Sequence, residues 1–209
     1  MYICQETRKP KGLIDVKSLI LDRSRRTAHA MPTVCLGLNG TLFWKINLSA
    51  ATAFPEDWLK NAVSVESNEG CHIVIPRPGA AELLVELERH ACPMIYSAQD
   101  EEFIEKALLQ LSIAQGDPDT CTDAEYEKSE AFYDHYVWSR DQCIAGSDGF
   151  RKSLGTLSEF SDNSINDIWL IDHSPERVDF PNHVIGVTEF KGDPQDRELF
   201  KVIDRIFVN

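Results

Sequence analysis

The stretch TVCLGLNGTLF, residues 33–43, decides the fold of this 209-residue chain. The apolar residues at its start predict a buried β-strand, because a short apolar run bounded by turn residues is typical of such strands. Asn39, Gly40 and Thr41 follow and predict a tight turn where that strand ends. Polar positions in such a turn are candidates for a functional site, and we analysed the rest of the chain outward from it.

Four further apolar runs predict β-strands, at residues 71–75, 93–97, 167–172 and 183–187. The run at 167–172 is almost continuous, as is typical of a parallel strand that is covered on both faces. Helical spacing of apolar residues occurs between several of these strands. The alternation predicts an α/β fold with a doubly wound, mostly parallel central sheet, whose ligands bind outside the carboxyl ends of the strands.

Three helices are predicted from apolar residues that recur at intervals of three and four. The first covers residues 80–87, with Pro78 in its first turn, and the second covers residues 101–111. The third closes the chain, with Asp193 as its N-cap and Pro194 in its first turn.

Two segments fall outside this pattern. Residues 43–69 are polar and aromatic and too long for a turn, so they predict a small insertion after the first strand. Residues 116–130 are acidic and predict a solvated surface loop. The length fits one domain at residues 33–209, preceded by a basic extension at residues 1–32.

Charge is distributed unevenly along the chain. There are 21 basic and 34 acidic residues, for a net charge of -13, yet residues 1–32 hold seven Lys or Arg against three acids. The acidic body disfavours a general affinity for nucleic acid or anionic membranes. We therefore expect a protein or phosphopeptide partner and no nucleic acid.

The cysteines and the hydropathy pattern bear on the compartment. No Cys-x-x-Cys spacing occurs, which favours buried free thiols over disulfides or a metal site. No apolar stretch approaches the roughly 20 residues of a membrane span, and no signal-peptide core follows Met1. We expect a soluble intracellular protein, cytoplasmic or nuclear, and organellar targeting by the Arg-bearing extension stays open. The six cysteines are Cys4, Cys35, Cys71, Cys92, Cys121 and Cys143.

Four short motifs occur in a characteristic order: Arg77-Pro78-Gly79, Tyr96-Ser97-Ala98, FRKSL at 150–154 and LIDHSP at 170–175. With the turn at 33–43, they make the chain resemble the haloacid dehalogenase superfamily. The branch is that of the RNA polymerase II C-terminal-domain (CTD) phosphatases, with their small nuclear, NLI-interacting-factor-like relatives and the presequence-receptor subunit of the mitochondrial inner-membrane translocase. Its members read Arg-Pro-Gly or Arg-Pro-His, Phe-Thr-Ala-Ser, Tyr-x-Lys-Asp-Leu and Asp-Asn-Ser-Pro. The resemblance covers about residues 33–207.

The resemblance implies a role for four residues. Ser97 matches the hydroxyl that binds phosphoryl oxygens, Lys152 matches the cation that balances their charge, and Thr41 supports the phosphate-binding turn. Asp172 matches an acid of the magnesium site. These residue types suit a dianionic phosphoryl group, which requires preorganised donors and positive charge.

Two departures from the family pattern affect catalysis directly. The superfamily strand ends in Asp-x-Asp-x-Thr, but this chain has Gly37 and Asn39 in place of the two acids. Gly37 has no side chain that could form an aspartyl-phosphate. Asn39 cannot transfer a proton as a carboxyl group does, although its backbone carbonyl remains available to a metal. No catalytic residue of the family's first motif is therefore intact.

The expected metal site also departs from the family. The branch has Asn after the acid of its fourth motif, where this chain has His173. Magnesium prefers oxygen ligands, so Asp172, His173 and Asn39 form a degenerate candidate site for Mg²⁺, and no cofactor is assigned with certainty. A zinc site at Asp172 and His173 lacks a third ligand.

Simpler interpretations exist for the same residues. Lys152 is either a solvated lysine or a crevice residue, and it is the obvious ion-pair partner of Asp172 in the absence of metal. Ser97 could cap the helix that follows it, together with or instead of binding an anion. His173 could be a surface or hydrogen-bonded histidine.

Three functions remain open at this stage. The leading hypothesis is a catalytically impaired phosphatase-like protein, a pseudophosphatase that serves as a phosphate-binding, peptide-binding or scaffolding module. The first alternative is an active hydrolase with a non-standard nucleophile or metal site, such as a water placed by Asp172 or His173. The second alternative is a structural subunit of a larger complex, with the basic extension docked on acidic partners.

Overall fold

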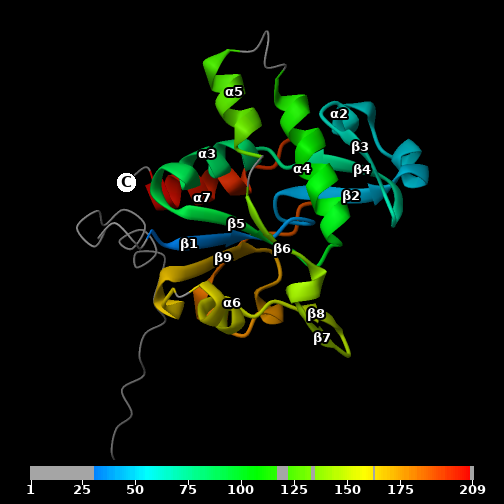
Figure 1. Cartoon of the computed structure of the whole chain (residues 1–209). Coiled ribbons are helices and arrows are strands. Elements are labelled where there is room, and N and C mark those ends of the chain that lie inside the picture. Colours follow the sequence, from blue (N-terminus) through cyan, green and yellow to red (C-terminus); the bar gives the residue numbers. More distant parts are fainter. Residues whose placement is uncertain (1–30, 117–121, 133–134, 162, 208–209) are drawn as a thin grey trace, which may run out of the picture.

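The computed structural model describes residues 31–116, 122–132, 135–161 and 163–207. Its centre is a five-stranded sheet in the order β10-β9-β1-β5-β6, and every adjacent pair is parallel (Figure 1). The predicted parallel α/β sheet is thereby confirmed. Its strands are β1 (Thr33–Leu36), β5 (Cys92–Tyr96), β6 (Tyr136–Trp138), β9 (Ile168–Asp172) and β10 (Val184–Gly186).

Helices cover both faces of this sheet, as a doubly wound fold requires. In Figure 1, α6 (Leu154–Ser161) lies on one side of the sheet, and the other helices described below lie on the opposite side. Side chains that alternate along β1 face the two layers: Val34 and Leu36 join the larger core cluster, and Cys35 joins the cluster under α6. The helices on the opposite side are α3 (Ala80–His90), α4 (Glu101–Gln115), α5 (Asp123–Glu130) and α7 (Glu198–Phe207).

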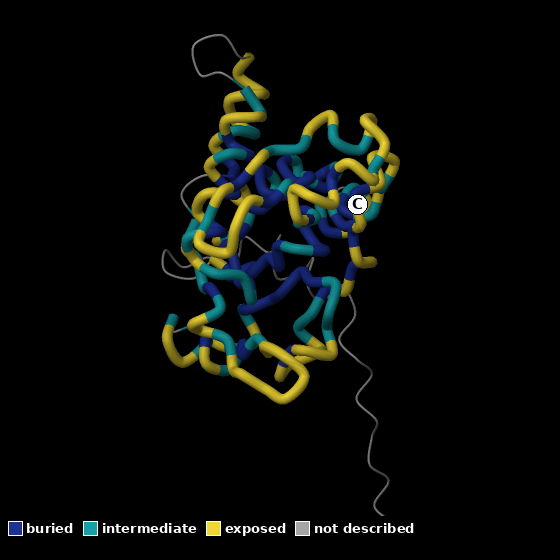
Figure 2. The backbone as a smooth tube through the Cα atoms, turned by 90° about the vertical axis from the view of Figure 1, so that its right-hand side faces the viewer, coloured by how far each residue is buried: buried dark blue, intermediate teal, exposed yellow. Residues whose placement is uncertain are grey.

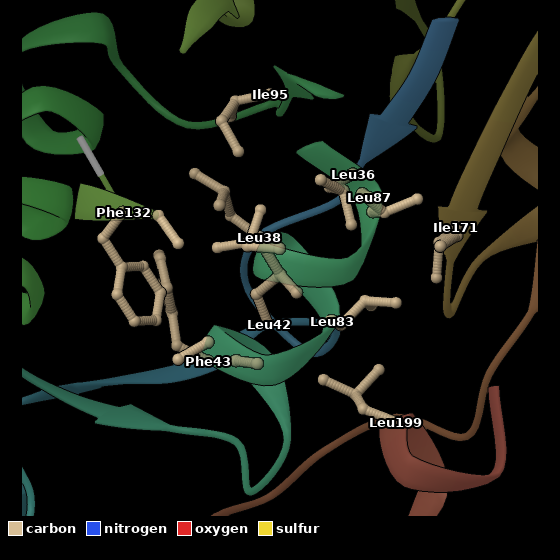
Figure 3. Close-up of a cluster of buried hydrophobic side chains, with 14 of the residues drawn as sticks. Leu36, Leu38, Leu42, Phe43, Leu83, Leu87, Ile95, Phe132, Ile171 and Leu199 are labelled. Atoms are coloured by element: carbon tan, nitrogen blue, oxygen red, sulfur yellow. The ribbon is translucent and has the colours of Figure 1, made fainter. Parts of the chain in front are cut away.

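The turn after β1 is anchored by its apolar residues. Leu38, Leu42 and Phe43 are at most 1% exposed and point into the cluster that Figure 3 shows, together with Leu83 and Leu199. In the backbone view of Figure 2, the residues of the central strands are buried and those at the periphery are exposed. Because the apolar residues of the turn are packed inside, its polar positions are left at the end of the strand.

The predicted insertion after the first strand exists but is longer than expected. It is an antiparallel sheet in the order β2-β4-β3, with a 3-10 helix at Leu48–Ala53 and the short α2 (Glu56–Leu59). The strand predicted at 71–75 is β4 and belongs to this small sheet, not to the central one. Its strands are β2 (Phe43–Asn47), β3 (Val63–Ser67) and β4 (Gly70–Pro76).

The predicted acidic loop at 116–130 is wrong in its second half. Residues 123–130 form α5, and residues 117–121 lie outside the described part of the chain. A capping box at Thr122 and Glu125 starts the helix, and the Lys128 ammonium contacts the Glu82 carboxylate of α3 at 2.7 Å. Capping and a tertiary ion pair thus favour a helix in a segment without apolar periodicity.

Two predicted helix starts are also wrong. The final helix begins at Glu198, because the carboxylate of Asp193 accepts a bond from the Gln195 N–H (2.8 Å) in a separate turn. Asp193 and Pro194 therefore precede the helix. Helix α3 begins after Gly79, whose φ of 87° is left-handed, so Pro78 lies before the first turn.

The cysteine prediction is correct only in part. Cys35 is buried, but Cys71 and Cys92 are exposed, because each lies near the start of a strand rather than at its centre. Cys4 and Cys121 lie outside the described residues. Among the residues that the structure describes, no helix is long and apolar enough to cross a membrane.

Candidate functional site

A cavity of about 190 Å³ opens at the carboxyl ends of the central strands. Its lining includes Asn39, Ser97, Lys152, Asp172 and His173, which come from four separate segments of the sequence. The parallel register brings these side chains together, since Leu36 pairs with Ile95 and Ile171 and strands β1, β5 and β9 end at one edge of the sheet. We call this cavity the crevice.

Gly37 directly follows β1 and lies next to Asp172, which lines the crevice. Its N–H donates to the Ile171 carbonyl at 2.9 Å, which continues the strand pairing by one residue. A Cβ atom built on Gly37 would lie 2.3 Å from Asp172 Oδ2 and 3.0 Å from Thr41 Oγ1. The carboxylate of Asp172 therefore occupies the space that a side chain at position 37 would require.

Asp172 is held by bonds to both carboxylate oxygens. The Lys152 ammonium donates to Oδ2, and the Ser174 N–H donates to Oδ1 at 2.8 Å. Burial raises the pKa of the Asp172 carboxyl, but the charge and hydrogen bond of Lys152 outweigh it and leave this pKa below its ordinary value. Asp172 is therefore an anion at neutral pH, paired with the cation that sequence analysis named.

The backbone around Lys152 is fixed from both sides. Its N–H donates to the Arg177 carbonyl at 3.0 Å, and Tyr96 Oη accepts a bond from the next N–H, that of Ser153, at 2.8 Å. The Asp179 carboxylate then accepts the Leu154 N–H at 2.8 Å at the start of α6. Lys152 is consequently a crevice residue and not a solvated lysine.

Thr41 and His173 bond to each other rather than line a phosphate site together. Thr41 Oγ1 lies 3.1 Å from His173 Nδ1 and accepts a bond from the His173 N–H at 3.2 Å. The ring also covers Gly40, where a Cβ would lie 2.9 Å from the ring and where φ is 79°. His173 is thus the hydrogen-bonded histidine of the simpler interpretation, and the Thr41 hydroxyl lies between this ring and the position of Gly37.

Asn39 and Ser97 have different partners from those expected. Asn39 Oδ1 accepts the Lys45 N–H at 2.8 Å, which ties the turn to β2. Ser97 Oγ accepts the Gln99 N–H at 3.2 Å, whereas the cap of α4 is Asp100. The helix-cap interpretation of Ser97 is wrong, and its buried hydroxyl keeps a proton to donate into the crevice.

The residues present do not fit a magnesium ion. Both oxygens of Asp172 are engaged, the side-chain oxygen of Asn39 faces the Lys45 amide, and His173 offers a nitrogen. In the described ranges, no group of three His, Cys, Asp or Glu side chains is arranged to hold a metal.

Two arginines and one lysine at the site were missed by sequence analysis. Arg177 lines the crevice, and no carboxylate among the described residues forms an ion pair with it. Arg140 and Lys45 lie at the rim, where both pair with Glu69, and the hydrogen bond from Lys45 lowers the pKa of the Glu69 carboxyl. No local motif signals these residues, because they come from three distant segments.

Sequence analysis used Arg77 only to recognise a family motif, but the structure shows that its side chain fixes the turn after β1. Its guanidinium is buried and makes two 2.9 Å bonds to the Asp196 carboxylate. It also donates to the carbonyls of Thr41 (3.3 Å) and Thr188 (2.9 Å). The motif arginine therefore connects the turn at Thr41 to the segment before α7.

Comparisons with solved structures agree with this architecture. The fission yeast RNA polymerase II CTD phosphatase Fcp1, in a variant bound to beryllium fluoride, is 17% identical with a TM-score of 0.54, over 77% of this chain and 42% of that one. A second structure of Fcp1, described as an essential RNA polymerase II CTD phosphatase, is 16% identical with a TM-score of 0.54, over 85% and 48%. The chain spans less than half the length of these structures.

Sequence comparisons add the family. No curated protein matches the chain. The family model described as NLI interacting factor-like phosphatase matches residues 32–206, which confirms the resemblance drawn from the motifs. The chain belongs to the NLI interacting factor-like phosphatase family, of the haloacid dehalogenase-like CTD-phosphatase type.

Proposed function

We propose that this protein is a pseudophosphatase whose crevice binds a phosphorylated peptide without hydrolysing it. One observation carries the proposal: the position of the family nucleophile is Gly37, and the Asp172 carboxylate lies 2.3 Å from where its Cβ would be. An aspartyl-phosphate cannot form at a glycine, and no other carboxylate can enter this space while Asp172 fills it. The standard covalent route is blocked twice.

The remaining groups of the crevice suit an anion. Ser97 has a hydroxyl proton to donate, Lys152 is a cation, and the exposed Arg177 forms no direct ion pair with a carboxylate in the described part of the chain. Arginine and a hydroxyl group are effective donors to phosphate oxygens, and their bonds are charge-assisted. The crevice therefore keeps groups that can bind a phosphate, although it lacks the nucleophile that would form a bond to phosphorus.

Asp172 limits the affinity of the crevice for phosphate. Its carboxylate already forms an ion pair with Lys152, so a phosphate dianion bound next to Lys152 would also lie close to the negative charge of Asp172. We expect Asp172→Asn to tighten phosphate binding by at least about threefold, since a like charge within a few ångströms is removed.

The experiment is fluorescence anisotropy with a labelled phosphoserine peptide and its unphosphorylated twin. Arg177→Ala should weaken phosphopeptide binding about tenfold, the value of a lost charge-assisted bond. Arg151→Ala is the matched control, because Arg151 is exposed on the neighbouring hairpin and already pairs with Asp148. Equal affinity for the two peptides would contradict the proposal.

One observation also supports a second candidate, an active hydrolase. The Asp172 carboxylate lies beside the position of the family nucleophile, so it could attack phosphorus and form an acyl-phosphate on Asp172, while the leaving alkoxide takes a proton from solvent water and departs as the alcohol. A second water would then hydrolyse the acyl-phosphate to inorganic phosphate and restore the carboxylate. The salt bridge to Lys152 and the bond from Ser174 oppose this attack, because they engage both oxygens. Turnover that is lost in both Asp172→Ala and Asp172→Asn would favour this candidate.

A further inference from the structure

An apolar groove of about 330 Å³ lies apart from the crevice, on the face of the sheet that carries α6. Its lining begins with Thr33 and Cys92, the first residues of β1 and β5, so it lies toward the amino ends of the strands. Trp138 and Leu157 form its sides. None of the crevice residues lines this groove.

Large aromatic side chains stand open at the groove. Tyr136 is 77% exposed and Phe160 is 80% exposed, and the Phe160 ring meets the Trp138 ring edge-on at 5.7 Å. Helix α6 has only eight residues and packs on β9, whereas four helices cover the opposite face (Figure 1). An exposed apolar surface of this kind is typical of a docking site.

The sequence contains a segment suited to this groove. Residues 13–21 read LIDVKSLIL, the most apolar part of the basic extension, and they lie outside the described residues. Leu13, Val16 and Ile20 recur at intervals of three and four, so they share one helical face. Asp15 and Ser18 fall on the other face, and Lys17 lies at the edge of the apolar face, where its long side chain can reach solvent, so the segment is amphipathic.

The connection to the groove is short. Residues 22–32 separate the segment from Thr33, which itself lines the groove, and eleven residues span up to about 36 Å when extended. The extension is basic and the rest of the chain is acidic, so their charges attract. Reach, apolar pattern and charge all favour this segment over an external partner.

We propose that residues 13–21 pack as an amphipathic helix in the groove and cover Tyr136 and Phe160. The extension then completes the helical layer on the α6 face of the sheet. This inference does not depend on the proposed function of the crevice.

Two exposed cysteines provide the test. Cys92 lies in the groove, and Cys71 lies on β4 in the small antiparallel sheet and serves as an internal control. In the full chain, Val16→Asp with Ile20→Asp should raise the rate of Cys92 alkylation by iodoacetamide about fivefold or more, because local docking no longer protects it. The Cys71 rate should not change, and Ser18→Asp, on the polar face, should leave both rates as in the wild type.

A variant on the groove side completes the design. Phe160→Asp changes an exposed side chain, so the fold should persist, and it should raise the Cys92 rate by a similar factor. Added to the double variant it should have little further effect, since both changes break one contact. Equal Cys92 rates in all variants would overturn the proposal. Protection of Cys92 that disappears on dilution would also overturn it and assign the groove to a second copy of the chain.

Discussion

Two buried ion pairs flank the turn after β1, and they differ in how completely their charges are satisfied. The Arg77 side chain is 0% exposed and bonds to Asp196, Thr41 and Thr188. The Lys152 side chain is 12% exposed and, among the described residues, forms an ion pair with Asp172 alone, beside a cavity of about 190 Å³. The first pair is closed, and the second faces space for a ligand.

The difference separates a structural arginine from a functional lysine within one motif set. A planar guanidinium with every direction bonded fixes geometry, because no donor remains for a ligand. An ammonium with unused donors next to a cavity can exchange its partner for another anion. Both residues belong to family motifs, so the motifs alone do not distinguish these roles.

Breaking the closed pair should have the largest effect. We expect Arg77→Ala to lower the free energy of unfolding by about 3–5 kcal/mol, since it removes one partner of a buried pair and several other bonds. Urea unfolding measures this value. Arg77→Lys should restore only part of the loss, because an ammonium cannot form the fork to Asp196. A loss below about 1 kcal/mol would show that the pair does not hold the turn.

Filling the space beside the open pair should cost less. Gly37→Ala places a Cβ atom 2.3 Å from Asp172 Oδ2 and should destabilise the protein by about 1–3 kcal/mol. The cost should largely disappear in an Asp172→Ala background, as a double-mutant cycle would show. Gly186→Ala is the matched control in β10, because its nearest contact is at 4.0 Å. Full additivity in the cycle would contradict the steric account of Gly37.

Acid should weaken both pairs. The folded-state pKa values of Asp172 and Asp196 lie below the ordinary value of 3.8, so each contributes stability that is present above pH 3.8 and lost as the pH falls through the folded pKa. We expect Asp172→Asn to flatten the fall in unfolding free energy below about pH 4. Urea unfolding at several pH values below about 5 measures this dependence, and Asp196→Asn should flatten it in the same way. An unchanged dependence of the unfolding free energy on pH in these variants would contradict the lowered pKa values of the two carboxyls.

An exposed ion pair should have the smallest effect. Lys128 and Glu82 meet at 2.7 Å, but their side chains are 38% and 37% exposed. Lys128→Ala should therefore change the free energy of unfolding by no more than about 1 kcal/mol. Thermal or urea unfolding gives the value, and a loss as large as that of Arg77→Ala would mean that burial does not govern these pairs.

Much of the fold could be predicted because its signals are local. The apolar runs at 93–97 and 167–172 are long enough to identify central strands, and the motif order identified the family. Strands β6, β7 (Ile144–Gly146) and β8 (Gly149–Arg151) were missed, since each has three residues and two are wholly exposed. Helix α5 was missed because a capping box and a tertiary ion pair, not apolar spacing, hold it.

The composition of the site was easier to predict than its geometry. Strand ends and motifs brought Ser97, Lys152 and Asp172 into one crevice, as sequence analysis expected. The Asn39 side chain faces the Lys45 N–H across the turn, and the Thr41 hydroxyl bonds to His173 in a distant segment, and no spacing rule encodes either direction. For the same reason, the absence of a side chain at Gly37 was visible in the sequence, whereas the carboxylate that fills its place was not.

The central claim is that the crevice does not hydrolyse phosphoesters, and the most direct test is phosphate release from a phosphoserine peptide with Mg²⁺ present. Wild-type protein should release no more phosphate than buffer, with or without a chelator. A triple variant, Gly37→Asp with Asn39→Asp and His173→Asn, supplies the family side chains, requires Asp172 to move away from position 37, and serves as the comparison. Magnesium-dependent turnover by the wild type, lost in Asp172→Ala, would contradict the account.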